Sequence, residues 1–279
     1  MKNLINNINS GRVPENLKEC DEICIESNEK AWNEDTYEAW VKRFGPPPEA
    51  CKKIIADPHK ILSVLKDILG DVKDKKIMNL MGSNGTKAVS LSLLGADITV
   101  VDFSEENRHY ALDLAKAADV KINYILSDVL KLPKEYITGD YDIVFAEMGI
   151  LHYFTDLNPF MHLIYNLLGN NGLFILRDFH PVSTKLISSK GSTAKVRKHK
   201  VTGDYFDTSL EEKDIAYSKY VANENGPQKV LLRKWNLGEI VTAVAEANLV
   251  IKSLQEEGNL SSEVFDKGIP KTFTLTARK

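Results

Sequence analysis

The stretch from Lys76 to Asp102 constrains the fold of this chain more than any other part of its sequence. An apolar run at 77–81 leads into the turn Gly82-Ser83-Asn84-Gly85, a helical stretch follows, and a second apolar run at 98–101 ends on Asp102. Glycine at the mouth of a strand lets the backbone approach a ligand that a Cβ atom would hold off. A carboxylate at the tip of the next strand is well placed to accept hydrogen bonds from a ribose diol. The stretch therefore predicts a nucleoside-binding unit whose ligand is an adenosine derivative.

Apolar runs and helical patterns alternate from Lys76 onward, which is typical of a parallel sheet with crossover helices. We expect strands at 77–81, 97–101, 122–126, 142–147 and 172–178, with helices near 85–95, 105–118 and 158–169. A further helix is expected over 235–247, and two last strands over 249–255 and 271–278. The pattern predicts the α/β class, with helices on both faces of the sheet.

The residues before this unit follow a helical pattern instead. Tyr37, Trp40 and Phe44 are spaced three and four apart, so they share one face of a helix. The run Gly45-Pro46-Pro47-Pro48 ends that helix, and a second helical pattern over 49–69 has a possible break near Asp57-Pro58. We expect residues 1–70 to form a helical extension or lid, and residues 71–180 to form the ligand-binding core.

The alternation stops after residue 180. Residues 181–234 are polar with scattered aromatic side chains, and we expect them to form an inserted cap over a substrate. Residues 235–279 then return to the core sheet. The basic patch at 195–200 is most simply a solvated surface, with contact to an acidic substrate as the alternative.

Composition and charge narrow the class of protein. A net charge of −3 gives no bulk electrostatic reason for nucleic-acid binding. Cys20, Cys24 and Cys51 form no Cys-x-x-Cys or Cys/His cluster, so we expect reduced thiols and no metal site. The N-terminus lacks the apolar core of a signal peptide, and no stretch approaches the length that crosses a bilayer. We expect a cytoplasmic protein without membrane or nucleic-acid partners, and its oligomeric state is left open.

The glycine turn does not have the spacing of a dinucleotide site. A pyrophosphate needs Gly-x-Gly-x-x-Gly ahead of a helix N-terminus, and this turn offers only Gly82 and Gly85. A cofactor without phosphates needs a close backbone approach but no anion cradle. S-adenosylmethionine is such a molecule.

At this point the chain resembles the class I, S-adenosylmethionine-dependent methyltransferases, over roughly residues 75–180 and the tail. The first motif of that family is a strand that ends in an acid and a leucine, followed by Gly-x-Gly-x-Gly. The matching segment here is 79–85, in which Asn79 stands where an acid is usual. Met81 and Ser83 replace the first two glycines, and Gly85 sits at a family glycine. Asn79 can still donate and accept hydrogen bonds.

The resemblance implies S-adenosylmethionine as cofactor, S-adenosylhomocysteine as product and a seven-stranded Rossmann-like methyltransferase sheet. Asp102 would bind the ribose with Phe103 beside the adenine, and Asp128 would bind the adenine amino group. The fourth strand would deliver Glu147 to the methyl-transfer centre. The cofactor-binding residues so implied are Asn79, Met81, Gly82, Ser83, Asn84, Gly85, Asp102, Phe103, Asp128, Val129, Glu147 and Met148.

Methyl transfer from a sulfonium needs alignment and, for a protonated nucleophile, a base. His152, which follows the fourth strand, has the pKa range of a base, although a histidine that merely packs there is an alternative. The candidates for a substrate pocket are Trp32, Tyr37, Trp40, Tyr153 and His180. The aromatic residues among them equally fit the packed face of a helix, and His180 fits a turn ahead of Pro181.

The sequence thus predicts a methyltransferase that acts on a small-molecule acceptor by in-line methyl transfer. Two alternatives stay open. An NAD-dependent oxidoreductase is disfavoured because the pyrophosphate glycines and a Tyr-x-x-x-Lys pair are missing. A non-catalytic nucleotide-binding or assembly protein with the same fold is allowed by the altered first motif.

Overall fold

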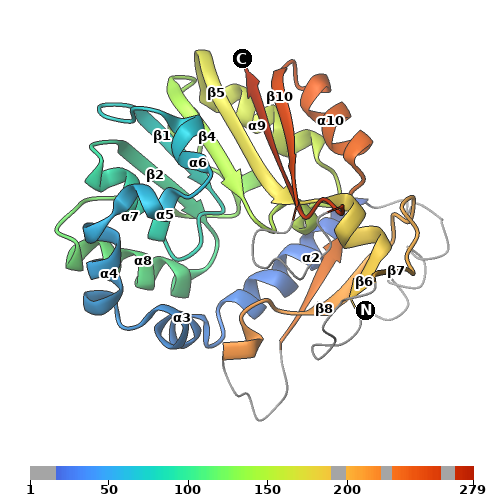
Figure 1. The fold of residues 1–279 in the computed structure, drawn as a ribbon, viewed down its shortest axis with the longest axis horizontal. Coiled ribbons are helices and arrows are strands. Elements are labelled where there is room, and N and C mark those ends of the chain that lie inside the picture. The colour runs from blue at the N-terminus through green and yellow to red at the C-terminus, as the bar shows by residue number, and fades with distance from the viewer. Residues whose placement is uncertain (1–16, 190–198, 221–227, 259–267) are drawn as a thin grey trace.

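The computed structural model describes residues 17–189, 199–220, 228–258 and 268–279. Its centre is a seven-stranded sheet with the strand order β10-β11-β5-β4-β1-β2-β3 (Figure 1). The strands are β1 (Lys76–Leu80), β2 (Asp97–Asp102), β3 (Asn123–Leu126), β4 (Tyr141–Glu147), β5 (Leu168–Phe179), β10 (Val250–Glu257) and β11 (Thr272–Arg278). β11 runs antiparallel between β5 and β10, and the other neighbouring strands pair in parallel. The prediction of the fold class is confirmed.

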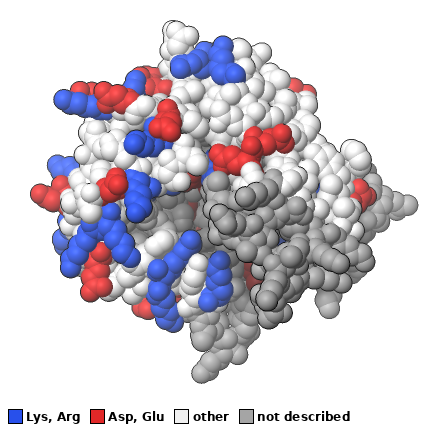
Figure 2. Space-filling model, viewed as in Figure 1, with Lys and Arg blue, Asp and Glu red and all other residues white. Residues whose placement is uncertain are grey.

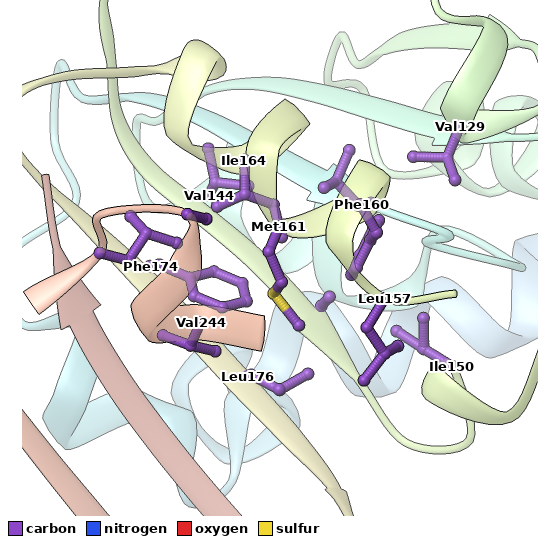
Figure 3. Packing of buried hydrophobic residues seen from close by; sticks show 14 of the residues in the cluster. Val129, Val144, Ile150, Leu157, Phe160, Met161, Ile164, Phe174, Leu176 and Val244 are labelled. Carbon is purple, nitrogen blue, oxygen red and sulfur yellow. The ribbon is translucent and has the colours of Figure 1, made fainter. Parts of the chain in front are cut away.

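Helices cover both faces of this sheet. The helices are α2 (Leu17–Trp32), α3 (Thr36–Phe44), α4 (Pro47–Ala56), α5 (Pro58–Leu62), α6 (Leu65–Leu69), α7 (Thr86–Leu93), α8 (Glu105–Ala117), α9 (Asn158–Leu167) and α10 (Leu237–Glu246). Helices α9 and α10 pack against one face of the sheet. There Met161 of α9 points toward the strand residues Phe174 and Leu176 (Figure 3). Helices α5 to α8 pack against the opposite face. Ile77 and Met78 of β1 point to opposite faces, as the two-residue period of a strand requires.

Local hydrogen bonds fix several helix starts that the sequence encodes. The Ser104 hydroxyl accepts from the Asn107 N–H and begins α8, and the Asp57 carboxylate accepts from the Lys60 N–H and begins α5. Asn236 and Glu239 form a capping box at the start of α10. Such caps stabilise a helix by about 1 kcal/mol each, so these boundaries depend on few long-range contacts.

Two features differ substantially from the sequence-based expectation. The helical pattern over 49–69 forms three helices, because Ser63, with a φ of 53°, separates α5 from α6 in addition to the expected break at Asp57-Pro58. The fifth strand begins at Leu168 and not at residue 172. Leu168 already pairs with Tyr141, and the register of β4 and β5 shifts just after that pair, which accommodates Asn171 at a φ of 61°.

The sheet topology places a ligand site at one edge. β1 and β4 are neighbours although β2 and β3 lie between them in sequence, so the connections leave the sheet in opposite directions at this point. Crevices in open α/β sheets form outside the carboxyl ends of the strands at such a switch point. In Figure 1 the arrowheads of β4 and β5 point toward α2, and the segment with β6 (Ile187–Ser189) and β8 (Leu210–Asp214) lies beside α2.

The N-terminal helices are joined to the inserted segment across this edge. The Asn28 side chain of α2 donates to the Leu231 carbonyl and accepts from the Leu231 N–H, at 3.1 and 2.9 Å. Leu231 belongs to β9 (Lys229–Arg233), which pairs with β8. The Tyr217 hydroxyl donates to the carbonyls of Ala31 and Glu34. Helix α2 and the paired strands β8 and β9 therefore pack together as one unit beside this edge of the sheet. The described helices include none that is long and apolar enough to span a bilayer.

Candidate active site

A crevice of about 630 Å³ opens at the carboxyl ends of β1, β2 and β4. Its floor is formed by the turn after β1 and by the ends of β2 and β4, and its walls are formed by α2, α3 and the segment around Tyr217. A smaller compartment of about 110 Å³ adjoins it and is lined by residues of α2, β2 and the segment after β3. The two cavities share Met81, Asp102, Phe103 and Tyr153. They adjoin at these four residues and are here called the large crevice and the small compartment.

The turn after β1 has a glycine-like backbone at positions that are not glycine. Met81 and Ser83 both have a φ of 51°, and Gly85 has a φ of 70°. A left-handed conformation costs a residue with a side chain about 1–2 kcal/mol, so the turn is strained at Met81 and Ser83, the two positions that replace glycines. The Ser83 carbonyl accepts from the Tyr124 hydroxyl at 2.8 Å, which helps to hold this strained turn.

Gly82 is required for a steric reason. A Cβ atom at this position would lie 2.6 Å from both Asn79 Oδ1 and Val100 Cγ1. We expect Gly82→Ala to lower the free energy of unfolding by about 1–3 kcal/mol because of this overpacking, as measured by urea denaturation. Gly238→Ala is the control, since a Cβ there meets its nearest atom at 3.3 Å and alanine suits α10. Equal stabilities of the two variants would contradict this prediction.

Asp102 lies at the end of β2 beneath the turn, 6% exposed. Its Oδ2 accepts from the Ser83 N–H at 2.9 Å, and its Oδ1 accepts from the Ser104 N–H at 3.0 Å and from Asn107 Nδ2 at 3.2 Å. Burial raises the pKa of Asp102, and these hydrogen bonds oppose that shift. Each carboxylate oxygen accepts about two hydrogen bonds. Oδ2 therefore keeps one free position, and a second hydroxyl would have to displace the Asn107 amide.

The small compartment has the features of an adenine site. Phe103, Asp128 and Val129 line it, together with Cys24 and Ile25 of α2. Asp128 Oδ1 accepts from the Leu130 N–H at 3.0 Å, whereas its buried Oδ2 has no partner among the described residues. Asp128 therefore caps the turn at Val129–Lys131 and still offers an acceptor for an amino group. An apolar slot with one carboxylate oxygen suits a purine base.

Glu147 and Met148 reach the large crevice from the end of β4. Glu147 forms an ion pair with Lys87 of α7, inside the crevice. Met148 has a φ of 62° and Gly149 a φ of 85°, so the chain turns sharply after β4. This turn directs the following residues across the mouth of the crevice.

His152 lies between the large crevice and the inserted segment. It lines the large crevice and a neighbouring pocket of about 170 Å³, which Asp178 and Lys213 also line. Burial lowers the pKa of His152 from its ordinary value of 6.5, and the charge of Asp178 opposes the shift. A lowered pKa keeps the imidazole neutral near pH 7, so that it can accept a proton. The packing alternative is compatible with its contact to Tyr153, whose ring centroid lies 4.7 Å away.

Three of the aromatic candidates line the large crevice. Trp32, Trp40 and Tyr153 meet there, and Trp32 Nε1 donates to the Tyr153 hydroxyl at 3.0 Å. The two tryptophan rings stack with centroids 6.4 Å apart. Trp40 Nε1 also donates to Asn107 Oδ1 at 2.7 Å, and Asn107 in turn donates to Asp102. Helix α3 is thus linked through Asn107 to the carboxylate at the floor of the crevice.

Three sequence-based site candidates do not line either cavity, and their placement corrects the expectation. Tyr37 packs against Tyr110 of α8 and donates to Asp113 Oδ2 at 2.8 Å, because it lies on the side of α3 that faces α8. His180 is 2% exposed, accepts from the Val182 N–H and contacts Glu256 of β10 at 2.6 Å. Gly85 begins α7 against Ala111, whose Cβ would lie 2.5 Å from a Cβ at position 85. These three residues pack or hydrogen-bond within the fold and do not face the site.

Sequence reasoning missed three groups that the structure brings to the site. Asn107 is 1% exposed and links Trp40 of α3 to Asp102. Asp178 is 3% exposed and accepts from the N–H groups of Gly149, Ile150, Leu151 and Phe179. Lys87 follows the glycine turn in the first turn of α7, a position that could have marked it in the sequence. Nothing in the local pattern indicates the long-range contacts of Asn107 and Asp178.

Comparisons with known proteins agree with this geometry. Residues 81–176 match the family model described as a methyltransferase domain. A ubiquinone biosynthesis O-methyltransferase of Rickettsia bellii is 23% identical over 145 residues, which cover 52% of this chain and 55% of that protein. The chain thus spans about half the length of the curated relatives that it matches.

Solved structures share the fold across most of the chain. A putative S-adenosylmethionine-dependent methyltransferase from Listeria monocytogenes superposes with a TM-score of 0.61 at 19% identity, covering 80% of this chain and 99% of that one. One from Mesorhizobium loti gives 0.60 at 18%, covering 81% and 100%. Magnesium protoporphyrin IX methyltransferase from Synechocystis PCC 6803, with bound S-adenosylmethionine, gives 0.53 at 13%, covering 90% and 95%.

Fold, crevice and family match together define a Rossmann-like cofactor-binding domain. More specifically, residues 81–176 match a methyltransferase domain, and the solved structures that share the fold include S-adenosylmethionine-dependent methyltransferases. The resemblance seen in the sequence is confirmed, and so is the cofactor class.

Proposed function

We propose that this protein transfers the methyl group of S-adenosylmethionine to a small-molecule acceptor in the large crevice. The observation that carries the proposal is the pair of acidic groups at two neighbouring strand ends. Asp102 offers a position for a ribose hydroxyl, and the unpartnered Asp128 Oδ2 offers one for an adenine amino group in the adjoining compartment. The cofactor assignments of the turn, Phe103, Val129, Glu147 and Met148 belong to this proposal.

The acceptor side of the crevice favours an anionic molecule with a flat apolar part. Trp32, Trp40 and Phe44 form an aromatic wall. The Arg43 guanidinium lies 4.7 Å from the centroid of Phe44 and 5.3 Å from that of Tyr220, and no described carboxylate pairs with it. Lys219 also lines the crevice, and Figure 2 shows basic side chains over α3, α4 and η5 (Ser218–Tyr220). Buried aromatic area and a guanidinium together suit an aromatic carboxylate.

The nucleophile in this proposal is a hydroxyl group. His152 borders the crevice and is neutral near pH 7, so it can take the hydroxyl proton while oxygen attacks the methyl carbon and the thioether leaves. The Rickettsia relative is an O-methyltransferase by its name, which supports the same choice. In this scheme residues 1–70 act as a lid and residues 181–234 as a cap, and the structure describes parts of both. A cytoplasmic location and the absence of a nucleic-acid partner stay predictions from the sequence.

Calorimetry and methyl release test the proposal together. We expect micromolar binding of S-adenosylmethionine and S-adenosylhomocysteine and no binding of NAD. With labelled cofactor, we expect label to enter hydroxybenzoates more efficiently than their uncharged methyl esters. Binding of NAD alone would favour an oxidoreductase, and binding of none of the three would favour a non-catalytic protein. A preference for the esters would contradict the anionic acceptor while leaving the cofactor assignment intact.

A further inference from the structure

Lys87 and Glu147 form an ion pair inside the large crevice. Lys87 lies in the first turn of α7, and Glu147 is the last residue of β4. The pair therefore bridges the turn after β1 and the end of β4, the two elements that flank the topological switch point. The two side chains are only 24% and 13% exposed, and both line the cavity.

One oxygen of this pair has no partner. Glu147 Oε1 contacts Lys87, whereas the buried Oε2 accepts no hydrogen bond from the described residues. A buried carboxylate oxygen without a donor is unfavourable, and such atoms in a folded protein need an explanation. The pair as it stands is thus incomplete as a structural brace.

The other charged groups of the crevice already have interaction partners or lie away from the glycine turn. Asp102 already accepts three hydrogen bonds, and Arg43 stacks on the aromatic rings of the lid. Beside the glycine turn, Asn79 is uncharged, and it lies in register with Phe145, close to Glu147 on β4. Among the described residues that line the crevice, Lys87 and Glu147 are therefore the pair of opposite charges next to the turn.

We propose that the Lys87–Glu147 pair is the receptor for the zwitterionic amino-acid end of the cofactor. This inference rests on the proposed function, because it requires the cofactor to occupy the large crevice. As the ligand enters, the pair exchanges partners. The ligand carboxylate takes the Lys87 ammonium, and the ligand ammonium donates to Glu147, including the Oε2 that now lacks a donor. In this way the end of β4 supplies the carboxylate that position 79 does not.

A purely structural pair predicts something different. A brace between α7 and β4 would, when broken, weaken every ligand of the crevice by a similar factor through a looser turn. A receptor for a zwitterion would weaken only those ligands that carry the amino-acid end. S-adenosylhomocysteine carries this end, and 5′-methylthioadenosine lacks it while keeping the adenine, the ribose and the sulfur. The ratio of their two dissociation constants therefore separates the two roles.

The experiment is calorimetric titration of both ligands into the wild type, Lys87→Met and Glu147→Gln. We expect each variant to bind S-adenosylhomocysteine about 10- to 100-fold more weakly, from the loss of one charge-assisted hydrogen bond. Binding of 5′-methylthioadenosine should stay within about threefold of the wild type. Lys76→Met is the matched control, because it breaks the ion pair with Asp140 at the opposite end of β1. It should change neither affinity.

A double variant with the two charges exchanged separates a loss of binding from a loss of folding. The double variant Lys87→Glu with Glu147→Lys can re-form an ion pair, but it presents each charge to the wrong end of a ligand that the ribose anchors. We expect a melting temperature near that of the wild type and weak binding of S-adenosylhomocysteine. Recovery of that affinity in the swap, or an equal loss for both ligands in the single variants, would overturn the proposal. A wild type that binds neither ligand would instead overturn the proposed function, and this inference with it.

Discussion

His152→Gln is expected to lower kcat for a hydroxyl acceptor by about 10²- to 10⁴-fold, the usual contribution of a positioned general base. The affinity for S-adenosylhomocysteine should stay close to that of the wild type, because His152 lines the acceptor side of the crevice and not the small compartment. The matched control is His162→Gln, since His162 is exposed on α9 and lies in neither cavity. An unchanged kcat in His152→Gln would contradict the role of base.

Protonation of His152 makes both the stability and the activity of the protein depend on pH, and the direction of both effects follows from its lowered pKa. Burial holds the pKa of His152 below 6.5 in the folded protein, so the unfolded chain binds more protons as the pH falls below that value. The stability that neutral His152 contributes is present above about pH 6.5 and is lost as the pH falls through the lowered pKa. We expect urea denaturation of the wild type to show this loss and His152→Gln to lack it. The rate of methyl transfer should fall over the same range.

Asp102→Asn is expected to weaken S-adenosylhomocysteine binding by about 100-fold. The substitution keeps the size of the side chain but removes the charge, and the loss of one charge-assisted hydrogen bond from a ribose hydroxyl to the carboxylate accounts for a loss of up to this order. Asp97→Asn changes the exposed residue at the other end of the same strand and should leave the affinity unchanged. Calorimetry and thermal melting of both variants separate binding from folding. An affinity of Asp102→Asn within twofold of the wild type would show that the ribose lies elsewhere.

Local chemistry made much of the fold predictable. Ser104 and Asp57 cap helices through bonds to residues three positions away, and such contacts can be read from the sequence alone. The apolar runs of β1 and β2 lie between layers of helices, which is why they read as short, nearly continuous apolar strands. Gly82 and Asp102 were identifiable because their spacing places a turn and a carboxylate at neighbouring strand ends.

The parts of the site that were missed depend on contacts between distant segments. Periodicity placed Tyr37 with Trp40 on one helix face, but only the position of α8 decides which of them turns toward the crevice. His180 was assigned to the ligand side because of its strand end, whereas Glu256 of β10 holds it in the scaffold. Asp178 positions the turn after β4 through bonds to residues far earlier in the chain. The left-handed backbone of Met81 and Ser83 was hidden because neither residue type favours it.

A crystal structure of the protein with bound S-adenosylhomocysteine is the most direct test of the site. We predict that a ribose hydroxyl donates to Asp102 Oδ2, that the adenine lies in the small compartment with its amino group on Asp128, and that the amino-acid end lies between Lys87 and Glu147. A ligand bound away from the carboxyl ends of β1 and β2, or a small compartment filled by the side chains of α2, would contradict this assignment.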